Sequence, residues 1–130
     1  MPTCVSAKFV CKNIYDKDQG PVALKQMKET VQKTVNDEKP KLEYKDSCKD
    51  GWLLTVTLDS LTVGDPAKPN SIEAKFTVVG VAVGTTASGF KANGSSKATG
   101  LNAKKMDEEV KFIVNDALGK LMTGKVIPEM

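Results

Sequence analysis

Two long stretches of alternating residues, 52–63 and 72–83, constrain what this chain can fold into more than any other feature. In the first stretch every second residue is apolar, and these residues are Trp52, Leu54, Val56 and Leu58. Period-two alternation in residues that favour extended backbone predicts a strand with one buried face. A proline-containing loop separates the two stretches, so we expect the strands to pair antiparallel, with the rest of the chain covering their apolar face.

The second stretch changes phase part of the way along. Its first half places one set of apolar residues on one face, namely Ile72, Ala74, Phe76 and Val78. Its second half places the apolar residues in the other phase, and these are Val79, Val81 and Val83. Gly80 lies at the change, so the sequence predicts a β-bulge near this glycine.

Shorter elements precede these strands. Residues 5–12 alternate and predict a first strand, and residues 22–38 carry apolar residues at three- and four-residue steps, which predicts an amphipathic helix. Pro21 suits the first turn of that helix and Pro40 lies just beyond its end. Residues 41–46 predict a short strand, followed by a tight turn into Trp52.

A second amphipathic helix is predicted near the end of the chain. Its apolar stripe consists of Met106, Val110, Ile113, Ala117 and Leu121. We expect Asn102 to cap its beginning, Gly124 to cap its end, and residues 126–130 to form a tail.

Residues 84–101 differ in composition from the rest of the chain. They are rich in Gly, Ser, Thr and Ala, and only Phe90 could anchor them, which predicts a mobile loop or a loosely held hairpin. Gly89 and Gly94 have the spacing of a phosphate-binding loop, but Ser95 and Ser96 follow where that loop requires Lys. The sequence therefore does not support phosphate binding here.

The order strand, helix, strand, strand, strand, helix predicts the fold class. We expect residues 1–130 to form a single α+β domain, with a mixed or antiparallel sheet of about four strands and two helices on one face. The sequence shows no internal repeat and no domain linker.

Composition limits the chemistry. The chain has 19 basic residues and a net charge of +3, and it contains neither His nor Arg. This removes the imidazole base, the His metal ligand and the bidentate guanidinium clamp. We therefore expect no catalytic residues, no metal or other cofactor, and no nucleic-acid partner. No apolar run approaches the ~20 residues of a membrane span.

The first residues and the cysteines bear on the compartment. Residues 1–4 show neither a basic start nor a following apolar run, so the chain is either cytosolic or a mature form whose leader has been removed. The cysteines are Cys4, Cys11 and Cys48, an odd number that leaves at least one unpaired within the chain. A Cys11–Cys48 disulfide is the more structural pair, and two buried free thiols are equally plausible. Cys4 is expected to be a frayed terminal residue, with a reactive or lipid-modified cysteine as the alternative.

Carboxylate pairs offer little for catalysis. Asp16 and Asp18 follow the first strand, and Glu108 and Glu109 lie at the start of the last helix. Nothing in the sequence places either pair in an apolar cleft, so a solvated turn and a helix start explain them.

Polar residues on the outer face of the two long strands are the candidate binding site. Cross-strand pairing of Thr and charged residues explains them structurally, and a binding face is the sharper hypothesis. Including two residues of the 84–101 segment, the predicted partner-binding residues are Thr55, Thr57, Asp59, Lys75, Thr77, Phe90 and Lys91.

The layout resembles small bacterial envelope domains. These are the N-terminal domain of the TolB translocation protein and the related domains of curli-secretion and penicillin-binding-protein-activator lipoproteins. The resemblance rests on Ala7-Lys8-Phe9-Val10 leading through Gly20-Pro21 into a helix, on the strands 52–63 and 72–83, and on the final helix ending in residues 116–122. The family's short Gly-containing turn between the long strands is replaced here by a Pro-rich loop. The resemblance implies partner binding at the cell envelope without catalysis.

The leading hypothesis is a non-enzymatic secreted or periplasmic protein that binds a protein or another envelope macromolecule, with a surface antigen of unknown role as one form of it. A small-ligand or lipid carrier, with its site between sheet and helices, is the alternative. An enzyme that uses Lys with Asp or Glu is a third hypothesis.

Overall fold

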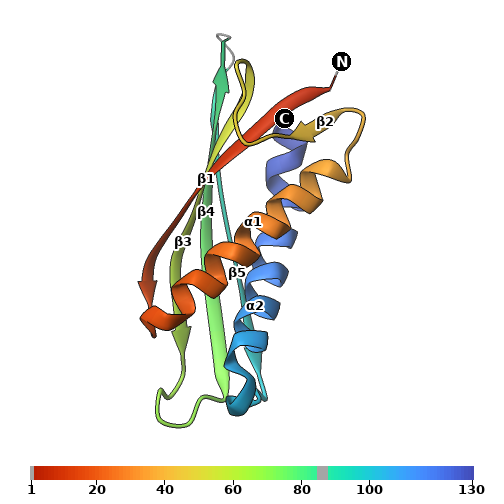
Figure 1. Cartoon of the computed structure of the whole chain (residues 1–130). Coiled ribbons are helices and arrows are strands. Elements are labelled where there is room, and N and C mark those ends of the chain that lie inside the picture. Colours follow the sequence, from red (N-terminus) through yellow and green to blue (C-terminus); the bar gives the residue numbers. More distant parts are fainter. Residues whose placement is uncertain (1, 85–87) are drawn as a thin grey trace.

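A single mixed sheet organises the computed structural model, which describes residues 2–84 and 88–130 (Figure 1). The sheet has five strands in the order β2-β1-β3-β4-β5. The strands are β1 (Thr3–Ile14), β2 (Leu42–Tyr44), β3 (Gly51–Val63), β4 (Ser71–Val83) and β5 (Phe90–Thr99). β1 pairs parallel with β2 and with β3, whereas β3, β4 and β5 pair antiparallel in succession.

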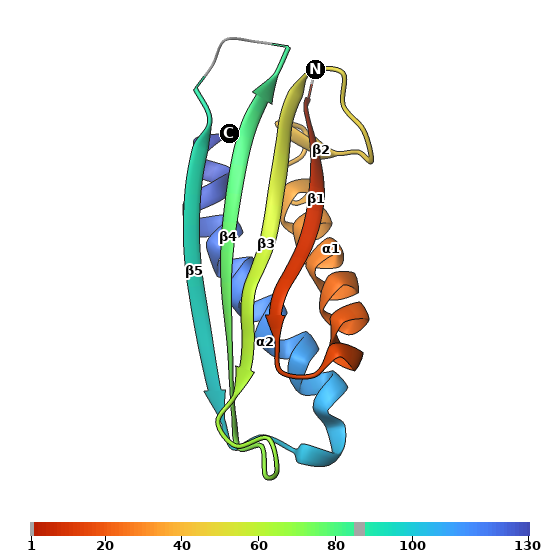
Figure 2. The ribbon, with the colours of Figure 1, turned by 90° about the vertical axis from the view of Figure 1, so that its left-hand side faces the viewer.

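Two helices, α1 (Gly20–Asn36) and α2 (Met106–Leu121), lie side by side on one face of the sheet (Figure 1). Short 3₁₀ turns lead into them, η1 (Lys17–Gln19) before α1 and η2 (Ala103–Lys105) before α2. Asn102 caps η2 by accepting a hydrogen bond from the Lys104 backbone N–H. Figure 2 shows the opposite face of the sheet, which no helix within residues 2–84 and 88–130 covers. The molecule therefore has two layers.

The core lies between these layers. The apolar residues that alternate along β3 and β4 are buried, and so are the apolar stripes of both helices. The predicted α+β class, the antiparallel pairing of the long strands and the placement of two helices are confirmed. Trp52 is half-buried at the margin of this core, and Leu54, Val56 and Leu58 are fully buried.

The strand count is the main correction to the predicted fold. The sequence predicts about four strands, and the sheet has five. The additional strand is β5, which pairs along β4 from Gly80 to Ser71, in the region for which a mobile loop or a loosely held hairpin is predicted. Its side chains are too small and polar to show an apolar alternation. The segment is therefore recognised as a strand only from its pairing with β4. The rest of the predicted segment includes residues 85–87, which lie outside the described residues.

The bulge occurs elsewhere than predicted. The β3–β4 register is continuous at Gly80, which pairs with Leu54, and it shifts between Leu58 and Ser60. Gly80 is buried because Phe90 lies directly over it, at the position that a Cβ atom would take. Phe90 also contacts Trp52, with ring centroids 5.4 Å apart. The glycine therefore makes room for an aromatic ring, and the predicted phase change is wrong.

The disulfide also differs from the prediction. Cys4 on β1 bonds to Cys48 in the loop before β3, with 5.9 Å between their Cα atoms. Cys11 is the free cysteine, and its Sγ lies 3.9 Å from Met27 Sδ on the helix side of the sheet. The predicted Cys11–Cys48 pair and the frayed Cys4 are both wrong. The parallel register of β1 with β3 explains the outcome, because Val5 pairs with Trp52 and brings Cys4 close to the residues that precede β3.

The chain does not end in a loose tail. A π-helical turn, η3 (Met122–Val126), and a 3₁₀ turn, η4 (Ile127–Glu129), continue from α2. Val126 and Ile127 are buried in the core, and Gly124 lies inside η3, so it does not cap the helix as predicted.

Candidate functional site

The uncovered side of the sheet, called here the open face, brings most of the predicted binding residues together. Side chains alternate along each strand, so the neighbours of the buried positions point outward. The register aligns Lys8, Thr55, Val79 and Lys91 in one row across β1, β3, β4 and β5. The next row consists of Val10, Thr57, Thr77 and Asn93. Figure 2 shows these four strands side by side.

Asp59 lies on the open face at the β-bulge, in the same alternation as Thr55 and Thr57. The Thr77 hydroxyl donates a hydrogen bond to Asp59 Oδ2 at 2.6 Å, and the Asn13 side-chain amide donates to the Asp59 backbone carbonyl at 3.1 Å. Lys75 lies nearby, 4.0 Å from Glu73. These contacts fix the positions of the polar side chains around the β-bulge on the open face.

Phe90 does not share this face. Its ring points to the helix side, over Gly80 and against Trp52, while the next residue, Lys91, points outward. The open face therefore contains six of the seven residues predicted for partner binding, and Phe90 has a packing role instead.

Apolar side chains on the open face are the feature that the sequence interpretation missed. Val81 is 52% exposed and Val10 is 40% exposed. Leu53 pairs with Val81, and Val79 with Thr55, so the apolar residues adjoin the threonines. Without the assumed phase change at Gly80, simple alternation from Ile72 would have placed Val79 and Val81 outward. A shallow hollow of about 300 Å³ adjoins this region, lined by Ser6, Ala7, Lys8, Asp46, Ser47, Cys48, Leu53 and Val83.

Lysines occupy outward positions on three strands of the open face. On β1 they are Lys8 and Lys12, on β4 Lys75, and on β5 Lys91 and Lys97. Asp59 and Glu73 are the acidic residues on the outward positions of β3 and β4. The open face therefore has a net positive charge and a small apolar cluster, formed by Leu53, Val79, Val81 and Val83, at the end where β3 begins and β4 ends.

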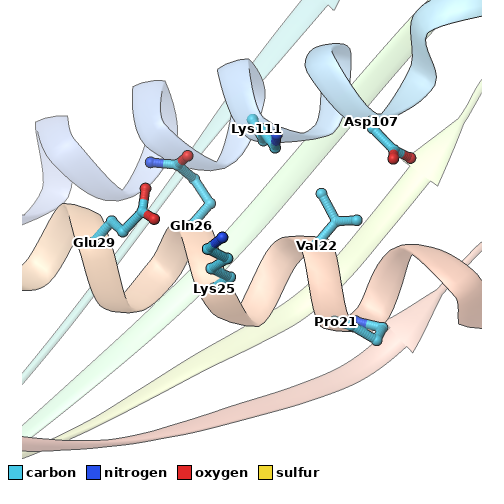
Figure 3. A pocket seen from close by; sticks show the side chains of 7 residues that line it. All are labelled: Pro21, Val22, Lys25, Gln26, Glu29, Asp107 and Lys111. Atoms are coloured by element: carbon cyan, nitrogen blue, oxygen red, sulfur yellow. The ribbon is translucent and has the colours of Figure 1, made fainter.

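A second concave surface lies between the first turns of α1 and α2 (Figure 3). This groove of about 360 Å³ is lined by Pro21, Val22, Lys25, Gln26 and Glu29 of α1 and by Asp107 and Lys111 of α2. Beside it, Gln19 Nε2 donates a hydrogen bond to Asp107 Oδ1 at 3.0 Å. The groove mixes both charge signs over a solvent-exposed surface and favours no particular ligand.

Tyr15 lies near this groove. Burial raises the pKa of its hydroxyl, and the carboxylates of Asp16 and Asp107 raise that pKa further. A phenol with a raised pKa stays neutral at physiological pH, so it offers no nucleophile or base here.

The carboxylate pairs considered for catalysis lie in a turn and at the start of a helix. Asp16 accepts a hydrogen bond from the Asp18 backbone N–H at the start of η1, and Glu108 lies 3.7 Å from Lys111 on α2. The described residues contain no group of three or more His, Cys, Asp or Glu side chains that could hold a metal ion. None of the helices within residues 2–84 and 88–130 is long and apolar enough to cross a membrane.

The predicted alternative of a ligand site between sheet and helices gains no support. The side chains between the layers form one continuous buried apolar cluster. The grooves described above lie on the surface of the molecule instead.

Comparisons with known proteins concern the fold. No protein-family model matches the chain, and no curated protein sequence matches it. Its structure is similar to the PelC dodecamer from Paraburkholderia phytofirmans, with a TM-score of 0.60 and 10% identity over 94% of this chain and 87% of that chain. A single-substitution variant of the same PelC dodecamer gives a TM-score of 0.62 at 9% identity, with the same coverage.

A weaker match is the rare lipoprotein B from Shewanella oneidensis, with a TM-score of 0.45 and 16% identity over 97% of this chain and 96% of that chain. A score at that level supports no conclusion about this chain. At 9–10% identity the PelC similarity concerns the fold alone: this chain has the same α+β arrangement as a PelC subunit.

Proposed function

We propose that this chain is a non-enzymatic, exported protein of the bacterial cell envelope, and that it binds another macromolecule through the open face of its sheet. The observation that carries the proposal is the open face itself. A sheet with helices on one side only leaves its other side in water, and here that side carries the exposed Val81 beside Leu53 and Val79, next to threonines and lysines. Exposed apolar residues that adjoin one another and have a polar rim are typical of interaction sites.

The disulfide supports the compartment. Bonds such as Cys4–Cys48 form and persist in oxidising environments, which include the bacterial periplasm and the cell exterior, and they are rare in the cytosol. The fold shared with PelC, a bacterial protein, is consistent with a bacterial origin. The absence of His and Arg from the sequence supports the non-enzymatic part of the proposal, because two common catalytic side chains are missing.

Fractionation of the source bacterium tests the compartment. An antibody against the chain should detect it in the envelope or secreted fraction, with Cys4 and Cys48 joined when free thiols are blocked before lysis. Detection of reduced chain in the cytosolic fraction alone would overturn this part of the proposal.

Site-specific photocrosslinking tests the binding surface. A photoreactive residue at Thr77 on the open face should form a defined adduct in living cells. The same residue at Leu24, which is 37% exposed on the helix layer, serves as the matched control and should form none. Adducts from both positions, or from Leu24 alone, would contradict binding through the open face.

A further inference from the structure

We propose that the open face binds the outer ridge of α2 from a second copy of the same chain, so that copies associate head to tail. The α2 ridge is defined here by Glu108, Glu109, Phe112, Asn115 and Asp116. This inference rests on the proposed role of the open face and names its occupant. Three observations support it: an exposed aromatic residue, opposite charges, and matching dimensions.

Phe112 is the most exposed large apolar residue in the described chain, at 60%. The buried stripe of α2 includes Val110, Ile113 and Val114, and Phe112 lies on the opposite side of the helix. An exposed phenylalanine at the centre of a helix face loses favourable burial unless a partner covers it, and aromatic residues contribute strongly to interfaces.

The exposed apolar residues divide between the two layers. Val10 and Val81 lie on the open face, and Leu24 and Phe112 lie on the helices. The open face also has the hollow of about 300 Å³ beside Leu53, which provides a concave surface for a ring such as that of Phe112.

The charges of the two surfaces are opposite. The outward positions of the five strands carry five lysines against three acidic residues, Glu43, Asp59 and Glu73, a net charge of +2. Helix α2 carries four acidic residues against Lys111 and Lys120, a net charge of −2. Two of these acids already pair within the helix, Glu108 with Lys111 at 3.7 Å and Asp116 with Lys120 at 3.0 Å. Glu109 makes no ion pair within residues 2–84 and 88–130, so it is available to a lysine of another copy.

The dimensions of the two surfaces agree. The lysines of β1 and β5 are separated by three strand spacings, or roughly 14 Å at about 4.8 Å per strand. A helix with its side chains is about 10–12 Å in diameter. Helix α2 of a second copy therefore fits between the two lysine rows, with Phe112 over the apolar cluster at one end of the open face and acids near the rows.

The two surfaces lie on opposite sides of the molecule, because one belongs to the sheet layer and the other to the helix layer (Figure 1). An interface between two different patches is heterologous, and repeated copies form a closed ring or an open filament. The PelC protein of similar fold is a dodecamer, which shows that a subunit of this shape is compatible with a multi-copy assembly.

Light scattering coupled to size-exclusion chromatography tests the proposal on the full chain. We expect a mass above that of the monomer that increases with concentration, and dissociation between about 0.1 M and about 1 M salt because the Debye length falls from about 10 Å to about 3 Å. Phe112→Ser should weaken association roughly tenfold or more, and so should the double variant Val81→Ser with Lys91→Glu. Leu24→Ser, an exposed apolar residue outside the α2 ridge, should leave association unchanged.

A mixing experiment identifies the geometry. The Phe112→Ser chain retains an intact open face, and the Val81→Ser/Lys91→Glu chain retains an intact α2 ridge. Each variant should be monomeric alone, and the mixture should form a heterodimer that does not grow further. A mixture that stays monomeric while the wild type associates, or self-association of the Phe112→Ser chain through its intact open face, would overturn the proposal.

Failure of this inference is distinguishable from failure of the proposed function. A wild type that is monomeric at millimolar concentration would rule out self-association. If Thr77 also formed a photoadduct with a different protein, the open face would remain a binding site. Circular dichroism of each variant checks that a lost association does not come from a lost fold.

Discussion

Gly80 and Phe90 show how a single residue determines local packing. Phe90 lies over Gly80, where a Cβ atom would stand, and its ring also contacts Trp52. This contact ties the edge strand β5 to the centre of the sheet. It is the aromatic rescue of a glycine in a strand, in which a neighbouring ring covers the backbone that the glycine leaves bare.

Gly80→Ala should destabilise the protein by about 1–3 kcal/mol, because the new methyl group forces the Phe90 ring out of its position. Urea denaturation measures the change. Gly124→Ala is the matched control, since a Cβ there has no neighbour within 4 Å, and it should have little effect. An equal effect of the two substitutions would contradict the packing described here. In a Phe90→Ala background the cost of Gly80→Ala should largely disappear.

Asp116 is an acidic residue whose ionised form stabilises the fold. The hydrogen bond from Lys120 Nζ, at 3.0 Å, lowers the pKa of the Asp116 carboxyl, partial burial opposes this, and Ser96 and the Lys120 charge lower it further. A carboxyl with a lowered pKa in the folded state stabilises the fold above its unfolded pKa of about 3.9, and the contribution is lost as pH falls through the folded-state pKa.

Asp116→Asn should therefore reduce the free energy of unfolding by about 0.3–0.5 kcal/mol near neutral pH, the usual value for an exposed helix pair. The difference from wild type should shrink as the pH falls below about 3.9. Denaturant titrations across this range measure it. Lys120→Met tests the origin of the effect, because it should reproduce the loss and make Asp116→Asn nearly neutral. A difference that grows toward low pH would refute the assignment.

At the scale of elements, the disulfide fastens the beginning of β1 to the loop that enters β3. Cys4 and Cys48 are 44 residues apart, and the loop they close contains α1 and β2. Gly51 supports this junction with a φ of 106° and a close approach to the Cys4 backbone carbonyl, which no other residue could make without strain.

Cys48→Ser should destabilise the fold by about 2–4 kcal/mol, because the open chain gains conformational freedom when unfolded. Thermal denaturation with and without reductant measures this, and reductant should have no further effect on the variant.

The native chain should show one thiol, Cys11, that reacts slowly with alkylating agents, since burial raises its pKa. Cys11→Ala is the control: it should leave the effect of reductant in place. Two or three reactive thiols in the native, unreduced chain would disprove the Cys4–Cys48 pairing.

At the scale of the whole molecule, strand order predicts where the structure opens first. β3 has hydrogen-bonded neighbours on both sides, β1 and β4, whereas β5 has a neighbour on one side and β2 spans only three residues. Hydrogen exchange measured by mass spectrometry should therefore be slowest in β3 and fastest, among the strands, in β2 and β5. Equal protection of β3 and β5 in the monomeric protein would contradict this order of opening.

Side-chain periodicity by itself determined the faces and the layers. The alternation from Trp52 to Leu58 indicates the apolar side of a strand, and the stripe from Met106 to Leu121 indicates the apolar side of a helix. Each can be read from the sequence because a strand or a helix brings side chains to the same face at a fixed spacing. This is enough to predict two helices over one side of a sheet, and to place Thr55, Thr57 and Lys75 on the other side.

Only the tertiary structure decided which distant residues meet. Strand register joins Cys4 to Cys48 and leaves Cys11 free, and pairing with β4 makes a strand of the Gly- and Ser-rich residues 90–99. The same pairing turns Phe90 inward over Gly80. These contacts depend on alignment between separate segments, and local periodicity carries no information about that alignment.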